Sequence, residues 1–151
     1  MTFLEWLGFF LVLQLVHFGG TWKLYRAAGE SPWKALIPIY NAVILMSKVK
    51  GRVIVTGVGK SAHIGNKISA TLTSTGTPSY FVHATEASHG DLGGIKRNDC
   101  IIVISNSGET VELFNIILHC KKINVPIIAI TSDKNSSLAK KSDIILEIPK
   151  N

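Results

Sequence analysis

The feature that most restricts the fold of this chain is an alternation of short β-branched runs with helix-forming segments between residues 52 and 148. Five apolar runs have the length and composition of buried strands, and they cover residues 52–56, 79–82, 100–104, 125–130 and 143–148. Three predicted helices lie between the runs, at residues 62–74, 108–122 and 136–140. Strands that alternate with helices build a parallel sheet through right-handed crossovers. The sequence therefore predicts an α/β fold with a parallel five-stranded flavodoxin-like sheet in the order 2-1-3-4-5.

Polar loops follow each of the first three predicted strands. They cover residues 56–61, 83–93 and 105–110. Loops after the strands of an open parallel sheet lie on one edge, the carboxyl edge, where such folds bind ligands. The sequence therefore predicts that these three loops converge on one small phosphorylated ligand.

The loop at residues 105–110 has the composition of a phosphate site. Ser105, Ser107 and Thr110 supply three hydroxyls, and Gly108 stands at the start of the predicted helix. Free amides and the dipole at a helix N-terminus favour a phosphate group, and hydroxyls add further donors. The alternative is ordinary N-capping of the helix by Ser107, although capping needs only one hydroxyl.

The glycine-rich loop after the first strand fits neither common nucleotide motif. A phosphate-binding P-loop would need glycine at residue 54, which is isoleucine. The spacing Gly57-x-Gly59-x-x-Ala62 satisfies the relaxed dinucleotide fingerprint, but that fingerprint also needs an acidic residue at the end of the second strand. Residues 76–82 contain no Asp or Glu, so the sequence disfavours a nicotinamide cofactor.

Two charged residues beside these loops are candidates for chemistry. Lys60 is expected to face the ligand, because a lysine at a helix N-terminus is unfavourable unless an anion is present. Glu112 lies one turn into the helix after the loop at residues 105–110, which we call the serine loop. The alternatives are a solvated lysine and a favourable first-turn acid. Ser61 is expected to cap the helix at residues 62–74.

The loop after the second strand contains titratable side chains. His83, Glu86, His89 and Asp91 lie within nine residues. Two histidines and a carboxylate can bind zinc, but this spacing matches no strong metal signature. We therefore predict no metal or other cofactor from the residues themselves.

The first 46 residues differ in composition from the rest. They hold all three tryptophans and two apolar runs, at residues 3–22 and 35–46. The first run reaches the roughly 20 residues that a membrane span needs. If it spans, Lys23 and Arg26 favour a cytoplasmic position for the remainder, tethered to the inner membrane. The alternative is a pair of buried core helices.

Charge and cysteine content exclude some classes of protein. The formal net charge is +6, but the basic residues are scattered without interleaved aromatics, so nucleic-acid binding is not predicted. Cys100 and Cys120 are too few for a disulfide framework.

Residues 51–151 resemble the sugar isomerase (SIS) domain and, within that superfamily, arabinose 5-phosphate isomerase. The motifs that carry the resemblance are Val55-Thr56-Gly57-Val58-Gly59-Lys60-Ser61-Ala62-His63-Ile64-Gly65, Ser74-Thr75-Gly76-Thr77-Pro78-Ser79-Tyr80-Phe81-Val82-His83, Glu86-Ala87-Ser88-His89-Gly90-Asp91-Leu92-Gly93 and Ile104-Ser105-Asn106-Ser107-Gly108-Glu109-Thr110-x-Glu112-Leu113. The family interconverts arabinose 5-phosphate and ribulose 5-phosphate through an enediol(ate), without a cofactor, and feeds Kdo and lipopolysaccharide synthesis. It forms homo-tetramers with shared active sites.

The resemblance implies roles for particular residues. Lys60, Glu112 and His89 are the implied catalytic residues, and an inhibitory zinc ion is implied at His83. Together with the hydroxyl residues of the first and third loops, the expected substrate contacts are Ser61, Gly76, Thr77, His83, His89, Ser105, Ser107 and Thr110.

The domain prediction is a hydrophobic helical segment at residues 1–46 and a SIS domain at residues 47–151. The first segment resembles the membrane N-terminus of a Bacteroidetes-type signal peptidase I, without its peptidase domain. The family continues past the fifth strand with a further essential Glu and His, so we expect a truncated domain with weak or no turnover. The alternatives are a non-catalytic sugar-phosphate-binding module and a fused gene product.

Overall fold

The computed structural model describes residues 49–149. The predicted hydrophobic segment at residues 1–46, including the run at residues 3–22, lies outside the described residues. Within the described range, no helix combines the length and the apolar character that a membrane crossing requires.

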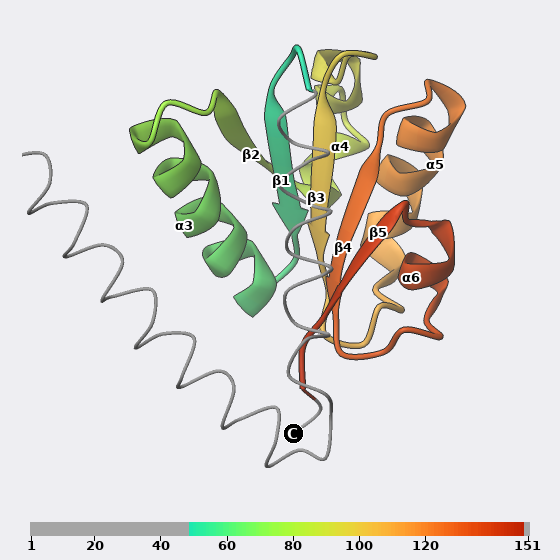
Figure 1. Cartoon of the computed structure of the whole chain (residues 1–151). Coiled ribbons are helices and arrows are strands. Elements are labelled where there is room, and N and C mark those ends of the chain that lie inside the picture. The colour runs from blue at the N-terminus through green and yellow to red at the C-terminus, as the bar shows by residue number, and fades with distance from the viewer. Residues whose placement is uncertain (1–48, 150–151) are drawn as a thin grey trace, which may run out of the picture. The chain divides into compact units, whose positions relative to one another are not determined.

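The described residues form a five-stranded, all-parallel sheet (Figure 1). The strands are β1 (Val53–Gly57), β2 (Ser79–His83), β3 (Cys100–Ile104), β4 (Ile127–Thr131) and β5 (Ile144–Glu147). Their order is β2-β1-β3-β4-β5, and every neighbouring pair is parallel. The predicted fold class and strand order are therefore confirmed.

The register of the three central strands aligns their carboxyl ends in one row. Gly57, the last residue of β1, is the partner of His83 in β2 and of Ile104 in β3. Because neighbouring strands lie about 4.8 Å apart, this row is only about 10 Å wide. The loops that leave the three strands therefore start within about 10 Å of one another.

The helices cover the two faces of the sheet (Figure 1). α3 (Lys60–Ser74) packs on β1 and β2 on one face, and Gly65 lets it approach closely, because a Cβ there would lie 3.0 Å from the Phe81 ring. The other face carries α4 (Ala84–Ala87), the 3-10 turns η1 (Asp91–Gly94) and η2 (Val111–Leu113), α5 (Phe114–Lys122) and α6 (Ser137–Lys141).

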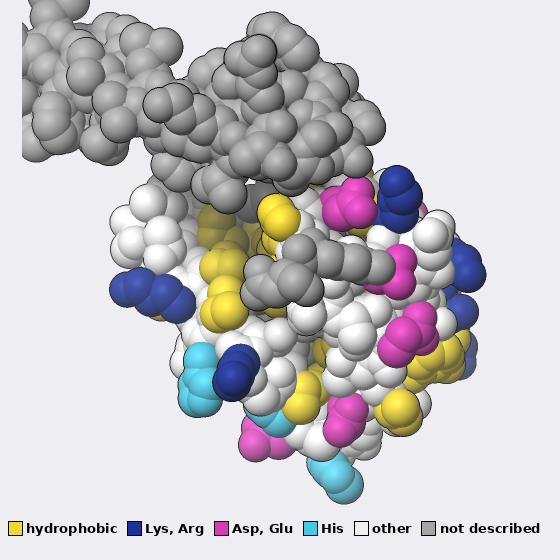
Figure 2. Space-filling view, turned by 90° about the horizontal axis from the view of Figure 1, so that it is seen from below, with side chains coloured by type: hydrophobic (Ala, Val, Ile, Leu, Met, Phe, Trp, Pro, Cys, Tyr) yellow, Lys and Arg dark blue, Asp and Glu magenta, His cyan; other side chains and the backbone are white. Residues whose placement is uncertain are grey.

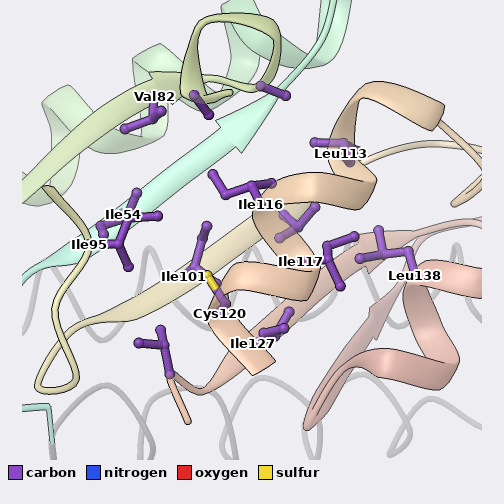
Figure 3. Close-up of a cluster of buried hydrophobic side chains, with 14 of the residues drawn as sticks. Ile54, Val82, Ile95, Ile101, Leu113, Ile116, Ile117, Cys120, Ile127 and Leu138 are labelled. Carbon is purple, nitrogen blue, oxygen red and sulfur yellow. The ribbon is translucent and has the colours of Figure 1, made fainter. Parts of the chain in front are cut away.

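The main hydrophobic core lies under α5 (Figure 3). Ile54 and Ile101 project from the sheet into it, and Ile116 meets them from α5. All three side chains are fully buried. Alternate residues of β1, such as Val53 and Val55, pack on the opposite face, as the two-residue period of a strand requires.

Two predicted helix starts are wrong. α3 begins at Lys60 rather than residue 62, and Gly59, not Ser61, occupies its cap position. The second difference follows the serine loop. The helix predicted at residues 108–122 begins at Val111, with the 3-10 turn η2 and then α5. Gly108 has a φ of 68°, which is incompatible with a right-handed helix. Gly108 therefore lies inside the loop, and the first helical turn starts at Val111.

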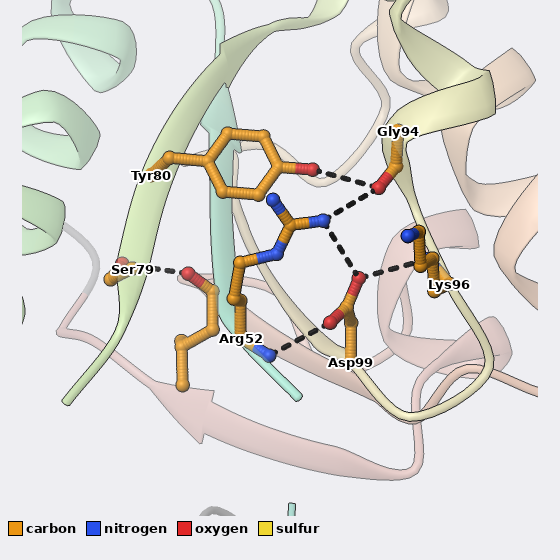
Figure 4. Close-up of polar contacts among 7 residues, drawn as sticks. Arg52, Ser79, Tyr80, Gly94, Lys96 and Asp99 are labelled. Carbon is orange, nitrogen blue, oxygen red and sulfur yellow. Dashed lines mark hydrogen bonds and ion pairs between the residues drawn. The ribbon is translucent and has the colours of Figure 1, made fainter. Parts of the chain in front are cut away.

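A polar network closes the amino edge of the sheet, opposite the predicted ligand loops (Figure 4). The buried Asp99 carboxylate accepts the amide N–H of Arg52 at 2.7 Å and that of Lys96 at 2.8 Å. The Arg52 guanidinium lies 4.7 Å from the centre of the Tyr80 ring and donates to the Gly94 carbonyl. These contacts fix the return of the long segment between β2 and β3.

Candidate anion site at the carboxyl edge

Lys60 and the serine loop lie on the same edge of the sheet. Lys60 follows β1 after a two-residue turn, and residue 105 follows β3 directly, so both leave the row that Gly57 and Ile104 define. Figure 2 views the domain from this edge and shows histidine, basic and acidic side chains on that surface. The predicted convergence of the first and third loops at one edge is therefore confirmed.

The N-terminus of α3 is open to an anion. No side chain caps its first amides, and no acidic residue lies in its first turn. Lys60 is exposed at its first position and Ser61 is half-buried at the second. The helix dipole places partial positive charge at this end, beside the lysine charge. An anion bound here would offset both charges.

The serine loop divides its hydroxyls between two tasks. The Ser105 side chain is buried, and its Oγ accepts the Gly108 amide at 3.0 Å and lies 2.7 Å from the Thr110 Oγ1. It holds the loop together from within. Ser107 is exposed, and its Oγ accepts the Glu109 amide at 3.3 Å. Ser107 is therefore the loop hydroxyl best placed for a ligand, whereas substrate contacts of Ser105 and Thr110 stay predictions.

The loop at residues 83–93, called the histidine loop below, borders the serine loop. His83 ends β2, its ring packs edge-on against Phe81, and its Nδ1 lies within hydrogen-bonding distance of the Thr85 hydroxyl. α4 packs on η2, and the Asn115 side chain donates to the Ser88 hydroxyl at 3.1 Å.

This packing places the segments that carry two of the predicted catalytic residues beside each other. His89 directly follows Ser88, and Glu112 lies in η2. Both side chains are exposed. The structure thus brings the elements that carry Lys60, His89 and Glu112 to the same end of the domain, and their catalytic roles stay predictions.

Gly76 and Thr77 do not join the other candidates. They lie between the end of α3 and the start of β2, and Thr77 donates its amide to the Leu72 carbonyl at 2.9 Å. α3 has 15 residues and is therefore about 22 Å long. These two residues consequently sit at the amino edge, a helix length from the serine loop of the same chain.

Among residues 49–149, no three His, Cys, Asp or Glu side chains come together as metal ligands. The zinc site implied at His83 remains a prediction.

A cavity of about 360 Å³ lies along β2 and η1, lined in part by Arg52, Tyr80 and Asp91. The Arg52 guanidinium already contacts the Gly94 carbonyl and Asp99 there, so this cavity offers a weaker anion site than the loops.

Sequence reasoning missed the loop after β4. Thr131 ends that strand, and Ser132 and Ser136 follow it before α6. Loops that follow parallel strands lie at the carboxyl edge, and this holds for the fourth strand as for the first three. The hydroxyls of Thr131 and Ser132 could have marked this loop as part of the site. This β4–α6 loop lies beneath the serine loop, and the Leu138 amide donates to the Gly108 carbonyl at 3.0 Å.

The fold and this edge together define an α/β domain with a parallel sheet and hydroxyl-rich loops where β1 and β3 end. The chain belongs to the SIS domain family, whose model matches residues 45–151.

Named relatives share this domain. The chain is 54% identical over 110 residues to arabinose 5-phosphate isomerase KpsF of Escherichia coli O6:H1, covering 72% of this chain and 34% of that protein. It is 52% identical over 126 residues to arabinose 5-phosphate isomerase KdsD of Francisella tularensis, covering 83% of this chain and 37% of that protein. The chain thus spans about a third of the length of these relatives.

Solved structures agree with this assignment. The structure of E. coli CFT073 c3406 in complex with arabinose 5-phosphate has a TM-score of 0.76 and 39% identity, covering 100% of this chain and 77% of that chain. A phosphosugar isomerase involved in capsule formation from Bacteroides fragilis has a TM-score of 0.69 and 38% identity, covering 73% of this chain and 60% of that chain.

Proposed function

We propose that this chain forms the sugar-phosphate site of an arabinose 5-phosphate isomerase. The observation that carries the proposal is the register of Gly57 with His83 and Ile104, which starts all three motif loops within one narrow row. Relatives at 52–54% identity are named for that activity. The phosphate would bind the α3 N-terminus, Ser61 and the serine loop.

The residues at this edge suit an aldose–ketose isomerisation. The reaction moves a proton between adjacent carbons through an enediol(ate), so it needs a base and a cation near the developing oxyanion. We assign the base to Glu112 and the oxyanion partner to Lys60. His83 and His89 would bind the sugar hydroxyls.

Gly76 and Thr77 can serve such a site only from another subunit. They lie a helix length from the loops within one chain. We therefore propose that the domain works as a homo-oligomer in which this turn of one copy approaches the carboxyl edge of another. The substitution Thr77→Val should then weaken sugar-phosphate affinity only under conditions in which sedimentation shows an oligomer.

Binding and turnover are separable by experiment. Calorimetric titration of the full chain with arabinose 5-phosphate, and with arabinose lacking phosphate, should give binding only for the phosphate ester. A coupled assay for ribulose 5-phosphate then tests catalysis. An enzyme should lose turnover on Glu112→Gln while retaining affinity, whereas a non-catalytic binding module would show no turnover before or after the change. Absence of affinity for any sugar phosphate would refute both functions.

We also propose that residues 3–22 contact the inner membrane and leave the SIS domain on the cytoplasmic side. The support is the length of this apolar run and the position of Lys23 and Arg26 after it. Membrane fractionation of the chain with and without residues 1–46 tests the proposal. Equal distribution of the two forms would contradict it.

A further inference from the structure

The backbone carbonyl of Asn106, in the middle of the serine loop, accepts three hydrogen bonds from the end of β4. Ser132 donates its amide at 3.0 Å and its hydroxyl at 2.8 Å. Thr131 adds its hydroxyl at 3.1 Å. Thr131 is fully buried and Ser132 is 6% exposed. A carbonyl oxygen has two lone pairs, so these donors saturate it.

This arrangement fixes the direction of a second group. The Asn106 carbonyl and the Ser107 N–H belong to one planar trans peptide, so they point in opposite directions. Because the carbonyl faces β4, the Ser107 N–H is turned away from β4. No group within residues 49–149 accepts this N–H, whereas the Gly108 and Glu109 amides are both used inside the loop.

We propose that Thr131 and Ser132 are positioning residues that aim the Ser107 amide at the phosphate group of the ligand. Donors on a carbonyl also polarise its peptide and strengthen the N–H as a donor. A preoriented amide does not lose conformational freedom when the ligand binds, which favours affinity. This inference rests on the proposed function and adds two residues to its site, the last residue of β4 and the first of the β4–α6 loop.

The test compares two serines that make the same kind of bond. Ser132→Ala removes a hydroxyl-to-carbonyl hydrogen bond of 2.8 Å at the serine loop. Ser142→Ala removes one of equal length at the far end of α6, where Ser142 donates to the Leu138 carbonyl. The full chain is titrated with inorganic phosphate and with arabinose 5-phosphate, and the Ser107 amide resonance is followed by NMR.

We expect both variants to lose similar thermal stability, since each loses one comparable hydrogen bond. Ser132→Ala should also lower the affinity for both anions by about threefold to tenfold. It should shift the Ser107 amide resonance of the ligand-free protein as well. Ser142→Ala should change neither. Thr131→Val should weaken binding as Ser132→Ala does, and Thr131→Ser, which keeps the hydroxyl, should restore it.

The outcomes separate this inference from the proposed function. Wild-type affinity in a folded Ser132→Ala or Thr131→Val variant would overturn the positioning role alone. Wild-type protein that binds inorganic phosphate but no sugar phosphate would end the proposed function and leave the positioning role standing. Wild-type protein that binds neither anion would overturn both.

Discussion

The Glu109 carboxylate accepts the backbone amide of Ser137 at 2.7 Å, although 28 residues separate them in the chain. Glu109 belongs to the serine loop and Ser137 opens α6, so the bond joins the candidate site to the β4–α6 loop. The same hydrogen bond is the main reason that the pKa of Glu109 is lowered from its usual value of 4.5.

This lowered pKa predicts a pH-dependent contribution to stability. A carboxyl whose pKa is lower in the folded state stabilises the fold above its unfolded pKa, and the contribution disappears as pH falls through the folded pKa. Glu109→Gln should therefore reduce the free energy of unfolding at neutral pH, and wild type and variant should converge at pH values well below 4.5. Urea unfolding at several pH values measures this. A difference that stays constant with pH would contradict the assignment.

Lys60 should matter for binding and little for stability. Lys60→Ala removes a positive charge from a helix N-terminus, where a cation is unfavourable in the absence of an anion, so the free protein should lose no stability. Affinity for a sugar phosphate should fall by about tenfold or more, because a hydrogen bond to a charged group contributes about 1.5–3 kcal/mol. Calorimetric titration checks this. Lys67→Ala, on an exposed position of the same helix, is the control and should leave affinity unchanged.

Gly108 should tolerate no side chain. Its φ is 68°, and an added Cβ would collide with the Ser136 hydroxyl. Gly108→Ala should cost at least about 1–3 kcal/mol of stability from backbone strain alone, and displacement of the loop should weaken phosphate binding. In Gly93→Ala the new methyl group meets nothing within 4 Å, so thermal unfolding should remain close to wild type. Equal unfolding temperatures for the two variants would disprove the close packing at Gly108.

Asp99 should contribute to stability without contributing to binding. Asp99→Ala leaves two amides at the amino edge without their acceptor, those of Arg52 and Lys96, and should cost about 2–4 kcal/mol. Asp143 makes a related bond to the Ile127 amide at 2.8 Å, but its side chain is 47% exposed, against 3% for Asp99. Asp143→Ala should therefore cost less. Denaturant unfolding ranks the two variants, and the reverse ranking would contradict the role of burial.

The two cysteines should resist alkylation in the native protein. Burial raises the pKa of the Cys100 thiol to about 11 and that of Cys120 to about 12. The reactive thiolate is therefore scarce near neutral pH. Mass spectrometry after iodoacetamide treatment should find both thiols modified only when the chain is unfolded. The raised pKa values also predict falling stability as pH rises above 9, because only the unfolded thiols then ionise.

Much of the fold follows from local patterns. β1 and β3 could be recognised as β-branched runs such as Cys100–Ile104, because strands buried on both faces are apolar throughout. The helix starts were less accessible. Ser61 has the composition of a cap, but Gly59, with a positive φ, occupies the cap position and the helix begins two residues earlier than predicted. Likewise, the residues around Gly108 do not predict that its backbone adopts a left-handed conformation.

The sequence predicted which segments meet at the site, but not which of their side chains are exposed there. The motifs placed Lys60 and the serine loop at one edge, and the register of Gly57 with Ile104 bears this out. The same reasoning treated Ser105 and Ser107 alike, whereas the structure buries one and exposes the other. The distinction depends on how the loop folds over β4, which neither serine specifies alone.

The sequence by itself determined the sheet order and the edge at which the motif loops meet. Strand periodicity and the right-handed crossover act within neighbouring segments, so a linear pattern contains them. Only the tertiary structure decided which groups face a ligand there. The bonds from Ser132 to Asn106 join residues 26 positions apart, and their geometry depends on the packing of two loops that no local pattern encodes.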